Sequence, residues 1–294
     1  MTDFNRRTLL GGLGTASVLA PYLAVERVMA QHAGHAPSGD QGQAGMMALH
    51  QRQMKDIFGD NLYRTEQIAM LVYPGFTALD LVGPHYFFAC MSGAKVHLVT
   101  TESDLAPVVS DLGLAIQPTI RMADVPATID VLFIPGGTNG TLSIMRRADV
   151  MGWISDRASR ARFITSVCTG SMVLAKAGLL KGKRATSHWG TRKVLADFGA
   201  VPVDDRVVRD GNIVTGAGVS AGLDYAIALV AMLRGRNYAE ALVLQSEYDP
   251  APPIKAGRPE DASPDVRNMM TTMFAPLADK FRDMARDAVA PKGA

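Results

Sequence analysis

The stretch FITSVCTGSMVLAKAGLL, residues 163–180, begins as an apolar run, breaks at Cys168, Thr169 and Gly170, and resumes with apolar residues at helical spacing. This pattern predicts a buried strand, a tight turn and a helix. In an open α/β sheet, ligands bind beyond the carboxyl ends of the strands, where strands turn into helices. Cys168 is therefore expected at a strand-to-helix elbow, where its thiol is a candidate nucleophile.

From residue 66 onward, short apolar runs alternate with helical segments. The continuous apolar character of the runs just before Gly137 and Cys168 indicates a sheet covered on both faces. Each helical segment is long enough to cross over to the next parallel strand. We predict an α/β fold, a parallel sheet flanked by helices, with strands at 67–75, 94–102, 129–137 and 161–168 and helices at 77–91, 141–160 and 170–180.

The composition suits one globular domain with additional segments, because 48% of the 294 residues are hydrophobic and 20% are charged. The formal net charge is +2, from 30 basic and 28 acidic side chains without a basic block. This distribution lacks the footprint of a nucleic-acid-binding protein. The two cysteines, Cys90 and Cys168, exclude a disulfide scaffold and a zinc site of the CxxC kind. We expect no metal and no organic cofactor.

Residues 1–30 indicate an export signal. Arg6 and Arg7 precede a weakly hydrophobic stretch with several glycines, which resembles a twin-arginine signal. The stretch is less apolar than a spanning helix, and VMA at 28–30 suits a signal peptidase. Its glycines and Pro21 argue against a buried helix. We therefore expect the twin-arginine export machinery as a partner and a periplasmic location, with an uncleaved membrane anchor as the alternative.

The rest of the chain divides into three predicted segments. Residues 31–65 form a linker rich in Gly, Gln, His and Pro, followed by a short helix. His32 and His35 lack a cysteine or carboxylate partner at ligand spacing, so we expect them to be solvated rather than metal-bound. The α/β domain is predicted at 66–262, and a charged, peripheral C-terminal helix at 263–294.

Three predictions concern the cysteines and their surroundings. The free N–H groups and the dipole of the following helix favour an anion, so Cys168 is expected to ionise more readily than a free thiol. Thr169 is expected to orient an intermediate or a water molecule through its hydroxyl, with a helix cap as the alternative. Cys90 lies on an apolar helix face, where a buried structural role is expected.

Two loops after other predicted strands add candidate residues. The bare backbone of Gly136 and Gly137 can approach a reacting centre and donate N–H groups, although a simple turn accounts for these glycines equally well. Asp80 stands between two leucines, where an aspartate is costly to bury without a partner. It therefore either caps a helix or serves the site.

From about residue 66 to 262 the chain resembles the isonitrile hydratase branch of the PfpI-like, class I glutamine amidotransferase-like superfamily. The resemblance rests on YPGFTALDLVGP, DVLFIPGG, SVCTGSMVLAKAGLLKGKRATSHW, DGNIVTGAGVSAGLDYA and SEYDPAPPIKAG. It implies a flavodoxin-like parallel sheet, Cys168 as the nucleophile and Asp80 beside it. It also implies a small-molecule substrate and a homodimer whose site lies close to the interface.

The resemblance further implies hydration of an isocyanide. A thiolate and a carboxylate in contact hold one proton between them, so Asp80 is the expected proton donor. Cys168 would attack the terminal carbon and form a thioimidate, which water converts to an N-substituted formamide. The backbone of Gly137 is expected to help with charge.

His188 and Trp189 follow a short predicted strand in ATSHWGTRK. A Cys–His pair is one interpretation. The resemblance places both residues near the pocket wall, which favours a structural or substrate-packing role. Thr169 stands where protease-like members of the superfamily carry a histidine, and this departure disfavours a peptidase or a glutaminase-like triad.

Two other functions stay open. The first is a glyoxalase- or hydrolase-type enzyme acting on small carbonyl compounds, and the second is a non-catalytic ligand-binding or redox-sensing module. A transcription regulator with a helix-turn-helix pair behind this domain is disfavoured, because residues 237–294 are too short and too interrupted by proline for two such motifs.

Replacing Arg6 and Arg7 with lysine tests the predicted export route. Twin-arginine export reads the pair itself and not only its charge, so the double variant is expected to stay in the cytoplasm at full length. Cell fractionation with mass measurement of the retained protein checks this. Unchanged export of Arg6→Lys/Arg7→Lys would point to the general secretory route instead.

Overall fold

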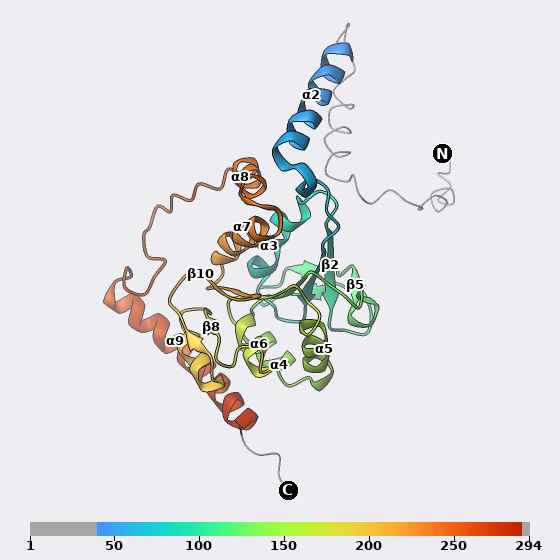
Figure 1. The fold of residues 1–294 in the computed structure, drawn as a ribbon. Coiled ribbons are helices and arrows are strands. Elements are labelled where there is room, and N and C mark those ends of the chain that lie inside the picture. Colours follow the sequence, from blue (N-terminus) through green and yellow to red (C-terminus); the bar gives the residue numbers. More distant parts are fainter. Residues whose placement is uncertain (1–39, 290–294) are drawn as a thin grey trace, which may run out of the picture. The chain divides into compact units, whose positions relative to one another are not determined.

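The computed structural model describes residues 40–289, and the side chains of 45–286 (Figure 1). The predicted signal at 1–30 and the first part of the predicted linker lie outside the described residues. Within the described range, none of the helices combines the length and the apolar character that crossing a membrane requires.

The chain divides into two compact units, Met1–Leu62 and Tyr63–Ala294. The described part of the first unit consists of helix α2 (Asp40–Phe58) and the short 3-10 helix η1 (Gly59–Asn61). Strands occur only in the second unit among the described residues. The second unit therefore contains the fold that the sequence pattern from residue 66 predicts.

A seven-stranded sheet forms the centre of the second unit, in the order β10-β11-β7-β6-β1-β2-β5. All neighbouring strands are parallel except β10 and β11. The prediction of a parallel sheet flanked by helices is confirmed, with one antiparallel pair at an edge. The strands are β1 (Gln67–Val72), β2 (Lys95–Thr100), β5 (Ile120–Arg121), β6 (Val131–Ile134), β7 (Phe163–Val167), β10 (Val207–Asp210) and β11 (Ile213–Gly216).

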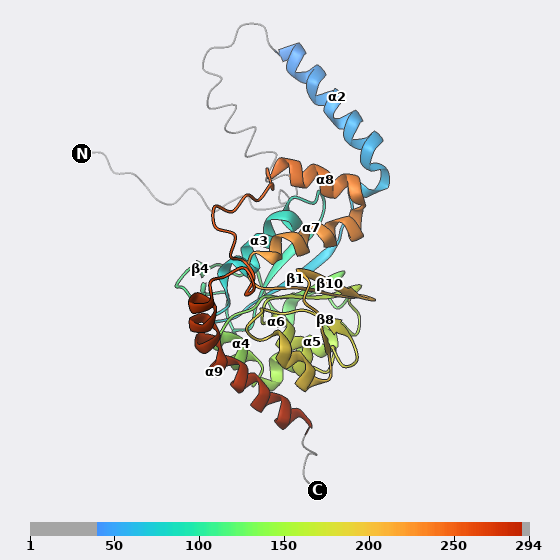
Figure 2. The ribbon, with the colours of Figure 1, turned by 90° about the vertical axis from the view of Figure 1, so that its left-hand side faces the viewer.

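Helices cover both faces of this sheet, which buries its apolar central strands β6 and β7 on each side. Figure 2 shows α3 (Ala78–Ala89), α7 (Ala221–Arg234) and α8 (Arg236–Gln245) on one side, and α4 (Asn139–Ile144), α5 (Ala148–Ala158) and α6 (Gly170–Lys176) on the other. Helix α9 (Pro264–Val289) packs against α6 and the 3-10 helix η3 (Arg192–Phe198). The smaller elements are β3 (Val108–Val109) paired with β4 (Ala115–Ile116), β8 (Arg184–Ala185) paired with β9 (Val201–Pro202), and η2 (Met122–Asp124).

The register of the sheet brings the carboxyl ends of its central strands to one edge. Ile134 at the end of β6 pairs with Ser166 of β7, and Val167 at the end of β7 pairs with Gly216 at the end of β11. Strand β1 runs parallel to β6 on the other side. The loops that follow β1, β6, β7 and β11 therefore meet, as ligand sites of open α/β sheets require.

The predicted helix at 141–160 is in fact two helices, α4 and α5, because Arg147 interrupts it. Its backbone is extended, with φ of −84° and ψ of 105°. The guanidinium donates to the carbonyl of Thr101 at 2.7 Å and forms ion pairs with Glu102 at 2.8 Å and Asp149 at 2.7 Å. These partners hold Arg147 outside the helical conformation, and helical periodicity carries no sign of them.

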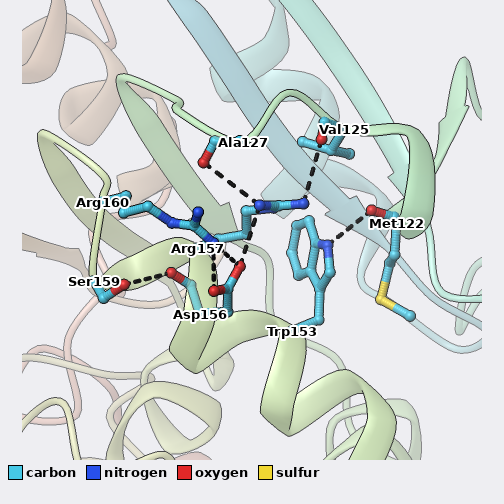
Figure 3. A network of polar contacts seen from close by, with 8 residues as sticks. All are labelled: Met122, Val125, Ala127, Trp153, Asp156, Arg157, Ser159 and Arg160. Atoms are coloured by element: carbon cyan, nitrogen blue, oxygen red, sulfur yellow. Dashed lines mark hydrogen bonds and ion pairs between the residues drawn. The ribbon is translucent and has the colours of Figure 1, made fainter.

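Side chains of α5 bind the loop that leads into β6 (Figure 3). Trp153 Nε1 donates to the carbonyl of Met122 at 2.8 Å. Arg157 donates to the carbonyls of Val125 at 3.3 Å and Ala127 at 3.4 Å, and its guanidinium carbon lies 5.7 Å from the centroid of the Trp153 ring. The helix thereby satisfies backbone acceptors of a loop that forms no ladder of its own.

A buried ion pair joins the end of α7 to the residue before β1. Arg234 Nη2 lies 2.6 Å from Glu66 Oε2, and both side chains are almost inaccessible to solvent. Nη2 also donates to the carbonyl of Arg64 at 2.9 Å, and the guanidinium stacks 5.0 Å from the centroid of the Tyr238 ring. Removal of one partner would leave an uncompensated charge in the core.

The Arg234→Met variant is expected to lower the free energy of unfolding by about 3 kcal/mol, because Glu66 stays buried with only the partly exposed Arg64, 3.7 Å away, as an ion-pair partner. The double variant Arg234→Met/Glu66→Leu removes both charges and should recover most of this loss. Urea denaturation of the two variants and the wild type measures the difference. A double variant as unstable as the single one would contradict this explanation.

Candidate active site

Cys168 lies between the last residue of β7 and the start of α6, with φ of 57°. Such a conformation strains a non-glycine residue by about 1–3 kcal/mol and requires support from its surroundings. The carbonyls of Gly216 and Ala217 accept its N–H at 3.1 and 3.0 Å. The hydroxyls of Ser171 and Ser187 each donate to its carbonyl at 3.0 Å. The main chain of Cys168 is therefore fixed on both sides.

The backbone N–H groups of Thr169 and Val219 act as hydrogen-bond donors toward the Cys168 sulfur and lower the pKa of its thiol, against the larger effect of burial. Val219 has φ of 21°, which a β-branched residue seldom adopts. The loop after β11 thus contacts Cys168 twice, at its N–H and at its sulfur. Sequence reasoning did not include Val219, because only the glycines before it suggest a tight loop and nothing in GAGVSAG indicates the direction of its N–H.

Asp80 is fully buried in the first turn of α3. Its Oδ2 accepts the N–H of Gly136 at 2.9 Å, and its carboxyl interacts with the Cys168 thiol. A β-carbon on Gly136 would lie 2.6 Å from Oδ2 and 2.7 Å from Cys168 Cβ, so a glycine is required there. Oδ1 has no N–H or O–H partner in the described part of the chain. Asp80 therefore faces the thiol and does not cap α3.

Burial changes the ionisation of both groups. It raises the pKa of Asp80 from 3.8 to about 7, against the hydrogen bond from Gly136. It also raises the pKa of the Cys168 thiol well above its usual value, and a charged Asp80 adds to the effect. The expectation that Cys168 ionises more readily than a free thiol is therefore wrong. Removing the thiolate from water raises the pKa of Cys168 by more than the two N–H donors lower it. The pair shares its protons and titrates as a unit.

Thr169 connects the turn at Cys168 to the loop after β6. Its hydroxyl donates to the Gly137 carbonyl at 2.7 Å, accepts the Gly137 N–H at 3.0 Å and lies 3.0 Å from Thr141 Oγ1. It makes no capping hydrogen bond to α6. The structure also corrects the expectation for the glycine loop, because the N–H of Gly136 is held by Asp80 and that of Gly137 by Thr169.

A cavity of about 290 Å³ has Leu79, His188, Trp189, Val219 and Pro259 among its lining residues. Cys168 and Asp80 do not line it themselves, and the cavity borders them through Ala217, whose carbonyl accepts the Cys168 N–H. Burial lowers the pKa of His188 to about 4, so its ring is neutral at pH 7. Nδ1 accepts the N–H of Gly190 at 3.2 Å. Among the hydrogen bonds of the described residues, none joins His188 to Cys168, so the geometry gives a Cys–His pair no support.

Cys90 differs from the expectation of a buried structural residue. It follows α3 and is half-buried, and its sulfur accepts a hydrogen bond from Gln245 Nε2 at 3.6 Å. Burial raises the pKa of its thiol. Within residues 45–286, no group of three or more His, Cys, Asp or Glu side chains is arranged to hold a metal ion.

The profile of the DJ-1/PfpI family matches residues 66–232, which is more than half of the chain. The chain belongs to the DJ-1/PfpI family. It is 46% identical to the isonitrile hydratase of Pseudomonas putida over 196 residues, which cover 67% of this chain and 84% of that protein. This identity supports the isonitrile hydratase branch of the family.

Two further relatives extend the comparison. The crystal structure of a THiJ/PfpI family protein from Pseudomonas syringae is 50% identical, with a TM-score of 0.76, and the match covers 78% of this chain and 94% of that one. The HTH-type transcriptional regulator GbdR of Pseudomonas aeruginosa is 29% identical over 60% of this chain and 49% of its own length. The chain is thus similar both to an isonitrile hydratase and to a transcriptional regulator.

Asp80→Asn is expected to stabilise the protein above pH 7 relative to the wild type. A carboxyl whose pKa rises on folding favours the folded state only while protonated, so the contribution of Asp80 to wild-type stability falls as the pH rises from about 4 to about 7. The Asp80→Asn variant lacks this pH-dependent loss, which amounts to about 4 kcal/mol in the free energy of unfolding. Urea denaturation of both proteins at pH 4, 5.5, 7 and 8 measures it. A difference independent of pH would contradict the raised pKa.

Proposed function

We propose that the protein hydrates an isocyanide, R–N≡C, to an N-substituted formamide at Cys168. The buried contact between the Cys168 thiol and the Asp80 carboxyl carries this proposal, because it places a nucleophile and an acid side by side without water. The 46% identity to the isonitrile hydratase of Pseudomonas putida supports the same substrate class.

In the first step, the pair holds one proton, and the Cys168 thiolate attacks the terminal carbon of the isocyanide. A C–S bond forms, one C–N π bond breaks, and the proton on Asp80 passes to the carbon. The product is a thioimidate, R–N=CH–S–Cys168. The N–H groups of Thr169 and Val219 hold the sulfur while its charge changes.

In the second step, water adds to the thioimidate carbon while the C=N π bond breaks and the nitrogen takes one proton of the water. The C–S bond then breaks, Cys168 leaves as a thiolate, and the other proton of the water passes from the new hydroxyl to Asp80 as the carbonyl forms. The product is R–NH–CHO. The unpartnered Oδ1 of Asp80 is available for both proton transfers, because Oδ2 is held by the N–H of Gly136.

A non-catalytic sensor is the second candidate, and the likeness to the regulator GbdR favours it. In that function the same cavity would bind a small molecule, and oxidation or occupancy of the Cys168 site would be the signal. Turnover separates the two functions, since a sensor binds without releasing product. Methylglyoxal beside an isocyanide tests an enzyme acting on small carbonyls in the same assay.

We also propose a homodimer and a periplasmic location. Leu79, Val82 and Tyr86 are exposed large side chains at helical spacing on α3, and Leu79 lines the cavity beside Cys168. A second copy covering this face would close the site near the interface. The signal-like residues 1–30 support export, which the arginine variant tests directly.

Cys168→Ala is expected to abolish isocyanide hydration, and Asp80→Asn to lower kcat by about 10²–10⁴-fold, because an amide transfers no proton. In the wild type, kcat/KM is expected to rise with pH through about 7, where the pair loses its first proton. Formamide release from a panel of small isocyanides, followed by chromatography between pH 5.5 and 9, measures all three.

Cys90→Ser serves as the matched control, since Cys90 lies at the opposite end of α3 from Asp80, and this variant should keep full activity. Full activity of Asp80→Asn would refute the acid role. Absence of turnover by the wild type on every isocyanide and oxoaldehyde, together with ligand-dependent protection of Cys168 from alkylation, would favour the sensor.

A further inference from the structure

Two segments that are distant in sequence enclose Cys168. The loop 216–219 accepts its N–H through two carbonyls and donates the N–H of Val219 to its sulfur. On another side, the hydroxyl of Ser187 donates to its carbonyl. These contacts can position the thiol only if the loop 216–219 and the segment that contains Ser187 are themselves held in place.

The segments touch where the His188 ring lies against Gly218. A β-carbon on Gly218 would lie 2.6 Å from His188 Cδ2, so only glycine leaves room for the ring. The His188 carbonyl accepts the N–H groups of Thr191 at 2.9 Å and Arg192 at 2.8 Å. These bonds hold the main chain of His188, whereas its ring depends on packing for support.

Phe274 of α9 provides that support. The centroid of its ring lies 4.6 Å from that of His188 and 5.5 Å from that of Trp189. Helix α9 is anchored independently of these rings, since it packs along α6 (Figure 2) and Lys176 Nζ of α6 donates to the carbonyl of Met284 at 3.0 Å. An unbroken series of contacts thus runs from α9 to the sulfur.

We propose that Phe274 is a positioning residue of the active site, which holds the His188 ring against Gly218 and so keeps the Val219 N–H directed at the Cys168 sulfur. Helix α9 begins at Pro264, beyond the residues 66–232 that the family profile matches. The C-terminal segment therefore supplies a part of the site that the matched domain lacks. The inference rests on Cys168 as the reactive thiol of the proposed function.

The physical reason is the conformation of Val219. Its φ of 21° is unfavourable for a β-branched residue and persists only where neighbouring groups impose it. Without the Phe274 ring, His188 can swing away from Gly218, the loop can relax, and the N–H donor moves off the sulfur. A thiolate that loses a hydrogen-bond donor becomes harder to form.

The pH dependence of Cys168 alkylation by iodoacetamide tests this proposal without any substrate. Measured by mass spectrometry in a Cys90→Ser background, Phe274→Ala is expected to raise the pH midpoint by about one unit, a tenfold change in ionisation. The direction of the shift separates this effect from easier solvent access, because burial raises the pKa of the thiol and added water would therefore lower the midpoint. Phe274→Tyr keeps the ring and should keep the wild-type midpoint.

Met273→Ala is the matched control, because Met273 is the preceding residue of α9 and 56% exposed. It should leave the midpoint unchanged. Melting temperatures report folding, and Phe274→Leu, which keeps apolar volume without a ring, carries the same test if the alanine variant does not fold. An unchanged midpoint in the folded variant would overturn the proposal. A shifted midpoint without isocyanide turnover in the wild type would count against the proposed function alone.

Discussion

The rest of the site depends on the contact between the Asp80 carboxyl and the Cys168 thiol. Both groups are buried, so hydrogen-bond donors of the protein, rather than water, must stabilise the charged form of either one. Gly136 supplies a donor to the carboxyl, and Thr169 and Val219 supply donors to the sulfur. These three N–H groups come from the loops after β6, β7 and β11. The order and register of the parallel strands, and not a single motif, bring them together.

Of the features of the fold, the buried segments were the easiest to predict from the sequence. Apolar runs ending in glycine or cysteine indicated the central strands, and the break at Cys168 indicated the turn, because hydrophobic periodicity reports which residues leave water. Hydrophobic periodicity did not predict the conformation of Arg147. Its extended backbone depends on partners from other parts of the chain, Thr101 and Glu102 among them, and the local pattern around it is helical.

The sequence indicated which backbone N–H groups are free to donate, but not which acceptors they bind. Gly136 and Gly137 were interpreted either as donors to a reacting centre or as a simple turn, and in the structure both N–H groups bind side chains of the site. The helix beginning at Gly170 favours an anion at Cys168, but a dipole effect of about 1 kcal/mol is smaller than the cost of removing a thiolate from water. Only the packed structure shows which of these effects prevails.

The enclosure of the sulfur has a further consequence for the shape of a molecule that could react with it. The Cys168 side chain is 6% exposed, behind the loop 216–219 and the glycine turn at Gly136. A planar carbonyl carbon carries substituents that spread to both sides of the atom under attack. The terminal carbon of an isocyanide carries none, and its substituent lies on the same axis beyond the nitrogen. If Cys168 is the nucleophile of the proposed reaction, its recessed position would favour slim, rod-like electrophiles by geometry before any difference in chemical reactivity matters.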